Sequence, residues 1–138
     1  MLSCPAGVLE GTLVVGLGID LIELDRVETA LARWGERFVA RLMDPIEAAR
    51  LPPEEPARSR ALALAIAGKE AGSKAIGTGW SRGVRWRDVE VFLGEAPRVV
   101  FHHAAAARAR ALGSSGAAHV PRLEIRGPLA LGEVWLLS

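Results

Sequence analysis

The chain has 138 residues, of which 50% are hydrophobic and 24% are charged; this is the size and composition of one ordinary globular domain. Its net charge of +1 gives no general reason to expect nucleic-acid binding, so a charged partner would have to be recognised by a local cluster. The single cysteine, Cys4, excludes an internal disulfide framework and a multi-cysteine metal site, and it suits a reducing cytoplasm.

The first eleven residues are predicted to be an N-terminal tail ahead of one domain over residues 12–138. The chain shows no pattern of a secretory leader, and no run of the roughly 18–20 apolar residues that a membrane span needs. The apolar run over residues 13–19 predicts a buried strand that ends at Asp20. Residues 23–42 then follow a helical period, with Gly35 as the point where the helix could split.

A short segment and a second major helix follow. Asp44-Pro45 suits the start of the segment, because aspartate caps helices well and proline fits a first helical turn. Residues 59–76 predict the helix, with Ser59 as its N-cap. The first half of this helix is apolar on all faces, so we expect it to be buried. Gly77 and Gly79 follow its end, as glycine commonly does after a helix.

The last third of the chain alternates between strand-like and helix-like segments. Pro121 restricts the strand that contains it to an edge or a bend of a sheet. The order of elements predicts an α+β domain. The predicted elements are strands at 84–93 and 99–101, a helix at 104–112, and strands at 119–125 and 134–137.

Three acidic and basic residues are candidates for chemistry. Asp20 is either a functional carboxylate at a strand end or a cap of the following helix. Glu70 and Lys74 are four positions apart and therefore share one face of their helix. They form either a simple ion pair or, because the helix is mostly apolar, a site that a metal ion or a phosphate completes.

Two glycine pairs have alternative interpretations. Gly77-Thr78-Gly79 either lets the backbone approach a ligand or only caps the helix and turns the chain. Gly16 and Gly18 do not form a dinucleotide-binding fingerprint, because the third glycine is missing and position 21 is leucine.

Four arginines would share one face of a continuous first helix, beside its apolar stripe. This face is either solvated, with its positive charge neutralised by nearby glutamates, or it is a docking surface for an acidic helix. The arginines are Arg26, Arg33, Arg37 and Arg41, and the glutamates are Glu23, Glu36 and Glu47.

Three fragments of the sequence resemble one known family. They are Gly18-Ile19-Asp20 with Arg26 six positions later, FVARLMDPIE over residues 38–47, and KEAxxKAxGTG over residues 69–79. Together they resemble holo-acyl-carrier-protein synthase, the small branch of the 4′-phosphopantetheinyl transferases, and the likeness runs from residue 13 to the C-terminus. The KEAxxKAxGTG match is highly specific, whereas the GID match would be weak alone.

The resemblance implies an antiparallel sheet packed on a long buried helix, with one domain per subunit of a homotrimer whose active sites lie between subunits. It implies transfer of 4′-phosphopantetheine from coenzyme A to a serine of an apo acyl carrier protein of fatty-acid or polyketide synthesis, with release of 3′,5′-ADP. It also implies Mg²⁺, which prefers a few carboxylates together with water and substrate phosphate oxygens.

The resemblance further implies a role for each matching residue. Asp20 and Glu70 would bind the metal, and with Lys74 they would be the catalytic residues. The base that accepts the serine proton would be a water on the metal or a carboxylate. The residues implied to bind coenzyme A are Lys69, Lys74, Gly77, Thr78 and Gly79, and those implied to dock the carrier protein are Arg26, Arg33 and Arg37.

The sequence departs from the family pattern at three places. Ala65 stands where the family often has an arginine, and Ile66 where it usually has an aromatic residue. The serine-and-histidine pair that follows His119-Val120 in the family is absent, and Glu124 stands where that histidine would be. These departures leave a second hypothesis, a non-catalytic relative that binds a carrier protein without turnover.

Overall fold

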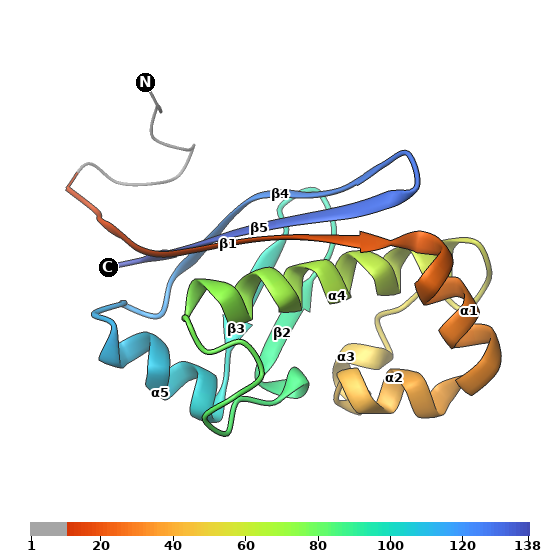
Figure 1. Cartoon of the computed structure of the whole chain (residues 1–138), viewed down its shortest axis with the longest axis horizontal. Helices are drawn as coiled ribbons and strands as arrows, with labels where there is room; N and C mark the ends of the chain where they lie inside the picture. Colours follow the sequence, from red (N-terminus) through yellow and green to blue (C-terminus); the bar gives the residue numbers. More distant parts are fainter. Residues whose placement is uncertain (1–10) are drawn as a thin grey trace.

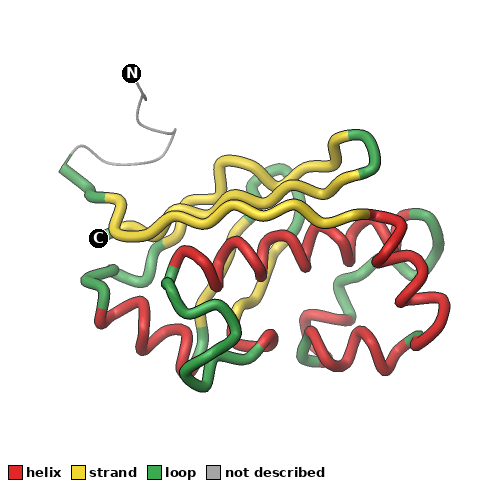
Figure 2. Tube along the Cα trace, in the orientation of Figure 1, coloured by secondary structure: helices red, strands yellow, loops and turns green. Residues whose placement is uncertain are grey.

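A computed structural model describes residues 11–138, so Cys4 and most of the expected tail lie outside the described residues. A three-stranded antiparallel sheet in the order β1-β5-β4 lies along one side of the long helix α4 (Figure 1). A separate antiparallel pair, β2-β3, packs against the same helix (Figure 2). No helix within residues 11–138 combines the length and apolar character needed to cross a membrane. The expected α+β fold, with an antiparallel sheet on a long buried helix, is confirmed.

The first strand, β1 (Val14–Glu23), is longer and less buried than expected. It forms an edge of the sheet and pairs only with β5 (Leu129–Leu137). Its side chains alternate between the face on α4 and the outer face, where Leu17, Ile19 and Leu21 are half-exposed. The prediction of a buried strand ending at Asp20 is therefore wrong on both counts.

The predicted first helix is split at Gly35, as its sequence suggested. Helix α1 (Leu24–Trp34) ends where Gly35 takes a positive φ of 55°, and α2 (Glu36–Leu42) begins directly afterwards. This conformation favours glycine because it has no Cβ. A third short helix, α3 (Pro45–Ala48), starts with Asp44 as N-cap residue and Pro45 in its first turn, although the Asp44 side chain makes no capping hydrogen bond.

Helix α4 (Ala57–Ala75) is buried on nearly all sides, as predicted. Ser59 is not its N-cap, because the helix begins two residues earlier. Instead, the backbone N–H of Ser59 donates to the Glu55 carboxylate at 2.8 Å, and its hydroxyl donates to the other oxygen of the same carboxylate. Ser59 was expected to supply the side-chain acceptor for the first turn of α4, and Glu55 supplies it instead.

The remaining elements follow the predicted order with shifted boundaries. Val84 and Trp86 lie outside strand β2, because a short 3₁₀ turn, η1, comes first. Pro121 lies on the edge strand β4, at an irregularity in its pairing with β5, as expected. The elements are η1 (Trp86–Asp88), β2 (Val89–Phe92), β3 (Arg98–Phe101), α5 (His103–Ala111) and β4 (Ala118–Arg126).

Three glycines allow the sheet to lie directly on the backbone of α4. A Cβ at Gly16 would collide with the carbonyl oxygen of Ala75, and a Cβ at Gly18 would collide with that of Ala71. A Cβ at Gly132 of β5 would likewise lie only 2.5 Å from the carbonyl oxygen of Ala67. The glycines therefore replace side-chain packing with backbone contact, and they bring the next residue on that face of β1 close to α4.

Candidate functional site

That next residue is Asp20, which lies inside β1 opposite Gly132 of β5. Because side chains alternate along a strand, Asp20 shares the inner face with Gly16 and Gly18 and points toward α4. Its carboxylate accepts from the Lys74 ammonium group at 2.5 Å, and 17% of its side chain is exposed. Asp20 is thus neither at a strand end nor a helix cap; the close approach of strand and helix positions it.

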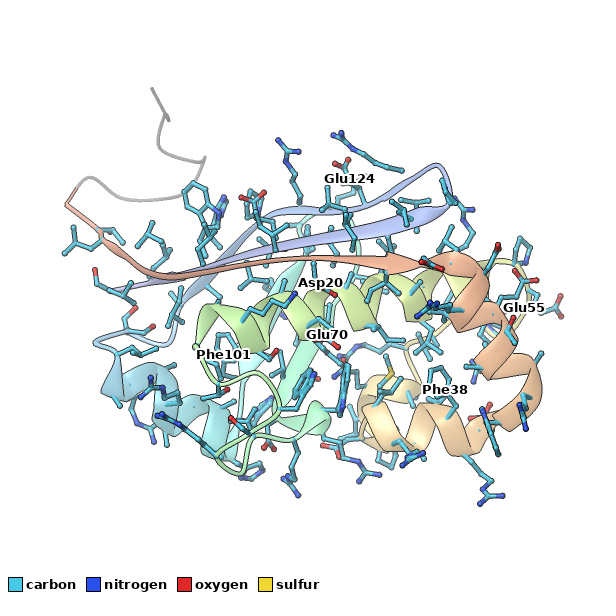
Figure 3. All side chains as sticks on the ribbon, viewed as in Figure 1. Asp20, Phe38, Glu55, Glu70, Phe101 and Glu124 are labelled. Carbon is cyan, nitrogen blue, oxygen red and sulfur yellow. The ribbon has the colours of Figure 1, made fainter. Side chains whose placement is uncertain are left out.

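Glu70 reaches the same place from α4. In the view of Figure 3, Asp20 lies on β1 above α4, and Glu70 lies on α4 below it. Burial raises the pKa of Glu70 above its usual value, and the negative charge of Asp20 raises it further. The Trp80 indole and the Lys74 ammonium act in the opposite direction. The two predicted metal-binding carboxylates, fifty residues apart in the chain, therefore lie close enough for their charges to act on each other.

Two tryptophans that the sequence analysis did not assign complete this environment. Trp80 follows Gly79 directly and stacks on Trp86, with ring centroids 4.0 Å apart and 23° between the planes. The Trp80 indole nitrogen is buried and has no hydrogen bond of ordinary geometry. Its position immediately after the GTG motif was the available signal in the sequence.

Gly77-Thr78-Gly79 forms the turn that follows α4. Gly77 and Gly79 have positive φ angles of 78° and 54°, and the backbone N–H groups of Thr78 and Gly79 both donate to the carbonyl of Ser73. The motif therefore acts as the helix-ending turn, which was one of its two interpretations. Its predicted contact with coenzyme A stays a prediction.

Lys69 does not lie in this site. Its side chain is fully buried, and the ammonium group donates to Glu47 Oε1 at 2.8 Å, to the Val89 carbonyl at 2.6 Å and to the Trp86 carbonyl at 3.1 Å. The second oxygen of Glu47 accepts from the backbone N–H of Val91 at 2.9 Å. All three donors of the ammonium group are used inside the chain, so the expectation that Lys69 binds coenzyme A is corrected: Lys69 ties α4 to α3, η1 and β2.

The donor set of the site fits a hard divalent cation. It offers two carboxylates from separate elements and no thiolate or imidazole. Mg²⁺ prefers such oxygen ligands, together with water and substrate oxygens that complete its coordination. Within residues 11–138, no three His, Cys, Asp or Glu side chains are arranged to enclose a metal ion. A cation here would therefore rest on the pair Asp20 and Glu70.

The arginines do not form the single helical stripe that was predicted, because Gly35 breaks the helix between Arg33 and Arg37. Arg26 pairs with Glu23 at 3.2 Å on an exposed surface. Arg33 lies over the Trp34 ring, with its guanidinium carbon 4.8 Å from the ring centroid. Neither Arg33 nor Arg37 forms an ion pair with a carboxylate in the described part of the chain.

A groove of about 550 Å³ lies where α1 meets α2, and we call it the α1–α2 groove. It has an apolar floor and a basic rim, and its lining residues are Ala30, Trp34, Arg37, Phe38 and Arg41. The predicted glutamate partners are used elsewhere in two of three cases, since Glu36 pairs with Arg58 and Glu47 with Lys69. Few carboxylates of the described residues are therefore left to neutralise the arginines of the basic rim.

Two of the departures from the family pattern have visible surroundings. Ala65 lines a small cavity of about 100 Å³ together with Arg50. Arg50 stacks on Phe92 at 4.1 Å and pairs with Glu90 at 2.9 Å, so an arginine reaches this place from another element. Glu124 lies on the outer side of the sheet, away from Asp20 and Glu70 of its own chain (Figure 3).

Comparison with known proteins shows the family that the chain resembles in sequence. Residues 16–120 match the family model of the 4′-phosphopantetheinyl transferase superfamily. A holo-[acyl-carrier-protein] synthase of Solidesulfovibrio magneticus is 46% identical over 105 residues, which are 75% of this chain and 83% of that protein.

Solved structures of holo-[acyl-carrier-protein] synthases also have this fold. The Neisseria meningitidis structure superposes with a TM-score of 0.75 at 24% identity, covering 90% of this chain and 98% of that one. The Bacillus anthracis structure, in complex with CoA (3′,5′-ADP), superposes with a TM-score of 0.69 at 28% identity, covering 91% of this chain and 97% of that one.

Proposed function

Because the chain belongs to the 4′-phosphopantetheinyl transferase superfamily, we propose that it transfers the phosphopantetheine arm of coenzyme A to a serine of an apo acyl carrier protein. The observation that carries this proposal is the meeting of Asp20, Glu70 and Lys74 where β1 lies on α4. A scaffold without catalysis would have no need to keep two carboxylates near each other at a partly buried place, because such a pair is costly.

In this reaction a bond forms between the carrier serine oxygen and the phosphorus that carries pantetheine. The serine hydroxyl loses its proton to a base, which is either a water or a carboxylate. The bond from that phosphorus to the oxygen bridging to 3′,5′-ADP breaks, and 3′,5′-ADP leaves with this oxygen. Phosphoryl transfer of this kind depends mainly on positioning the reactants and neutralising charge. When bound, Mg²⁺ would supply a positive charge for the pyrophosphate oxygens, and Asp20 and Glu70 are the residues that would hold it.

Lys74 would supply the second positive charge. Its ammonium group is paired with Asp20, and 49% of its side chain is exposed. It is therefore open to solvent at the edge of the site, where a flexible lysine can contact a phosphate oxygen. Gly77, Thr78 and Gly79 follow the C-terminal end of α4, where the two glycines, which lack a Cβ, would allow the coenzyme to approach the backbone.

We propose that the carrier protein docks on α1 and α2. Arg26, Arg33 and Arg37 present positive charge there, and the α1–α2 groove offers an apolar floor beside them. An amphipathic acidic helix would be matched by both features, since its carboxylates would meet the arginines and its apolar side would meet Trp34 and Phe38.

We also propose that the chain assembles as a homotrimer through the outer face of β1. Leu17, Ile19 and Leu21 are 52%, 51% and 57% exposed and follow one another on the same face. A row of large apolar side chains on an edge strand is a typical feature of a protein interface. A charge at its centre, Ile19→Glu, should convert trimers into monomers in light-scattering measurements. Monomers in the unchanged protein would contradict this assembly.

The proposed activity is tested by mass spectrometry of an intact carrier protein. The chain is incubated with an apo acyl carrier protein of fatty-acid synthesis, coenzyme A and Mg²⁺. A gain of one phosphopantetheine on the carrier is expected, and Asp20→Asn and Glu70→Gln should abolish it without unfolding the chain. Binding of several apo carriers without any mass gain would favour the non-catalytic alternative.

A further inference from the structure

Arg108 of α5 is a half-buried cation whose hydrogen-bonding capacity is mostly unused. Its Nε–H donates to the backbone carbonyl of Ile76 at 3.1 Å. Within residues 11–138, its guanidinium group makes no ion pair with a carboxylate and no further hydrogen bond. A guanidinium group has N–H donors on all of its nitrogens, so the donors of both terminal nitrogens are left for another acceptor.

The contact with Ile76 places this guanidinium group beside the turn that follows α4. Ile76 is the C-cap residue of α4, and α5 lies next to this end of the helix (Figure 1). Nη2 of Arg108 lies 3.9 Å from the point that a Cβ on Gly77 would occupy, and no other described atom outside the adjoining residues comes within 4 Å of that point. At Gly79 the corresponding space holds no described atom. The turn is therefore open, with Arg108 on one side of it.

The charges of the proposed reaction require a further cation near this turn. Coenzyme A carries a pyrophosphate and a 3′-phosphate, with roughly four negative charges at pH 7. The site sets a divalent cation and Lys74 against them, and Asp20 and Glu70 cancel most of that positive charge. Lys69 was expected to add to it, but its ammonium group is buried against Glu47. The C-terminal end of α4 also carries a negative partial charge, which disfavours a phosphate unless a cation lies beside it.

We propose that the terminal nitrogens of Arg108 bind a phosphate group of coenzyme A that lies on the Gly77-Thr78-Gly79 turn. This inference rests on the proposed use of coenzyme A. The group bound is either the 3′-phosphate or the pyrophosphate, because both present oxygens that match the paired N–H donors of a guanidinium group. The hydrogen bond from Nε to Ile76 holds the guanidinium group in place before the ligand arrives, which lowers the entropy cost of binding.

The alternative is that Arg108 only caps the C-terminal end of α4, where a cation is favourable in any case. A cap would affect the stability of the fold and leave the affinity for a phosphate unchanged. Arg108→Gln separates the two roles, because glutamine keeps an N–H donor and removes the charge. Arg110→Gln is the matched control, since it makes the same change at an exposed arginine two positions later, on the opposite side of α5.

The test measures ligand binding without turnover. Coenzyme A and 3′-dephospho-coenzyme A are titrated into each variant by isothermal calorimetry, with Mg²⁺ present and the carrier protein absent. We expect Arg108→Gln to raise the Kd of coenzyme A about tenfold, and Arg110→Gln to leave it unchanged. If Arg108 binds the 3′-phosphate, the loss is confined to coenzyme A; if it binds the pyrophosphate, both ligands lose affinity by the same factor. In either case the Kd should depend less steeply on salt, because a charge that salt screens has been removed.

Three results would count against the proposal, and they separate it from the proposed function. Unchanged affinities in Arg108→Gln would leave this residue as a helix cap only. A loss of affinity with unchanged salt dependence would indicate a distorted turn and would also overturn the role of Arg108. If the unchanged protein binds neither ligand, the proposed use of coenzyme A is wrong, and the role of Arg108 fails with it.

A measurement on the unchanged protein covers the case in which Arg108→Gln does not fold. The Nε–H resonance of Arg108 is recorded in ¹H–¹⁵N spectra and assigned through its connections to the backbone. Addition of coenzyme A with Mg²⁺ should shift this resonance more than that of Arg110, because a phosphate then contacts the same guanidinium group. An Arg108 resonance that stays in place when the protein is saturated with coenzyme A would contradict the proposed contact.

Discussion

The ammonium group of Lys74 lies 2.5 Å from Oδ1 of Asp20, although the two residues are 54 positions apart in the chain. This contact crosses from α4 to β1, and it provides the positive charge nearest to Asp20. We expect Lys74→Met to reduce transfer about 100-fold, in the range found when one charged or hydrogen-bonding partner of a developing anion is removed. Steady-state kinetics with apo carrier protein measures the loss.

Lys74→Arg is the matched control, because it keeps the charge and changes only its shape and hydration. It should retain more activity than Lys74→Met, and both variants should unfold at nearly the temperature of the unchanged protein, since a half-exposed ion pair contributes little to stability. Full activity in Lys74→Met would remove this residue from the proposed chemistry.

The contact between Gly18 and α4 gives a second prediction. A methyl group at position 18 would collide with the backbone of Ala71 and would lie 2.8 Å from the backbone nitrogen of Ala75. Backbone atoms cannot move aside as a side chain can, so β1 would have to shift. We expect Gly18→Ala to cost about 2–3 kcal/mol of unfolding free energy and to lower activity by separating Asp20 from Glu70.

Gly68→Ala is the control for this prediction. Its added methyl group would meet the side chain of Val91 at 3.1 Å, which can adjust. Alanine also favours a helix over glycine by about 1 kcal/mol. The two effects oppose each other, so denaturant unfolding should place Gly68→Ala within about 1 kcal/mol of the unchanged protein. Equal losses of unfolding free energy in both variants would show that the collision at position 18 is not the cause of the destabilisation.

The order and type of most elements were predictable because each carries its own local pattern. The exposure of β1 was not. The run from Leu13 to Ile19 reads as uniformly apolar, but its glycines face the helix and its large side chains face outward. Glycine counts as neither apolar nor polar in such a pattern, so the alternation between Gly16, Leu17, Gly18 and Ile19 was hidden. Backbone contact with α4 determines which face of β1 is buried, and no single segment of the sequence specifies this contact.

The site was predictable where motif and structure agree. Asp20, Glu70 and Lys74 were identified through the resemblance. In the structure Lys74 pairs with Asp20, and the charges of both act on Glu70. Lys69 was misassigned because it was carried over with the KEAxxKAxGTG motif of the resemblance. Consecutive residues of a helix point about 100° apart, however, and Lys69 faces the core on the side where Glu47 and the carbonyl of Val89 receive it.

The buried pair of Lys69 and Glu47 gives a third prediction. Burial lowers the pKa of Lys69, and the charge of Glu47 acts against this effect. Removing one partner leaves a buried charge alone, so we expect Glu47→Gln and Lys69→Met each to cost about 3–5 kcal/mol. Chemical denaturation of both variants measures the loss.

The double variant Glu47→Gln/Lys69→Met completes the cycle. It removes both charges, so it should be less destabilised than the sum of the single changes by about 2 kcal/mol or more. Glutamine retains an oxygen that can accept from the N–H of Val91, and this limits the secondary damage. Strict additivity of the two single changes would show that the two residues do not stabilise the fold as an ion pair.

The raised pKa of Glu70 gives a fourth prediction, for the metal-free chain. Because burial raises this pKa above its usual value of 4.5, the folded chain holds the Glu70 proton more tightly than the unfolded chain does. The resulting stabilisation is present at pH values below 4.5, and it is lost as the pH rises through the raised value. Above that value, the ionised carboxylate destabilises the fold.

Glu70→Gln removes this ionisation. In the presence of a chelator, the variant should be more stable than the unchanged protein at pH 7–8 by about 0.5–1 kcal/mol after allowance for solvent screening, and the difference should vanish near pH 4. Mg²⁺ with coenzyme A should stabilise only the unchanged protein. Thermal unfolding across this pH range provides the measurement, and a variant that is less stable at pH 8 would contradict the assigned environment of Glu70.

The arginines of α1 and α2 give the last prediction. Arg33 is not paired with any carboxylate in the described residues, whereas Arg26 is paired with Glu23, so Arg33 is freer to meet an acidic partner. We expect Arg33→Glu to raise the KM for the carrier protein about tenfold at low salt, and Arg26→Glu to raise it less. The kcat should change little, because the charge guides docking rather than chemistry.

The effect should shrink as salt is raised, because exposed charges are screened within about 10 Å at 0.1 M ionic strength. Arg110→Glu is the matched control: it makes the same charge reversal at an exposed arginine of α5, at the opposite end of the molecule from α1 and α2 (Figure 1). If Arg110→Glu raised the carrier KM as much as Arg33→Glu does, the response would reflect net charge alone. The α1–α2 groove would then have no special part in docking.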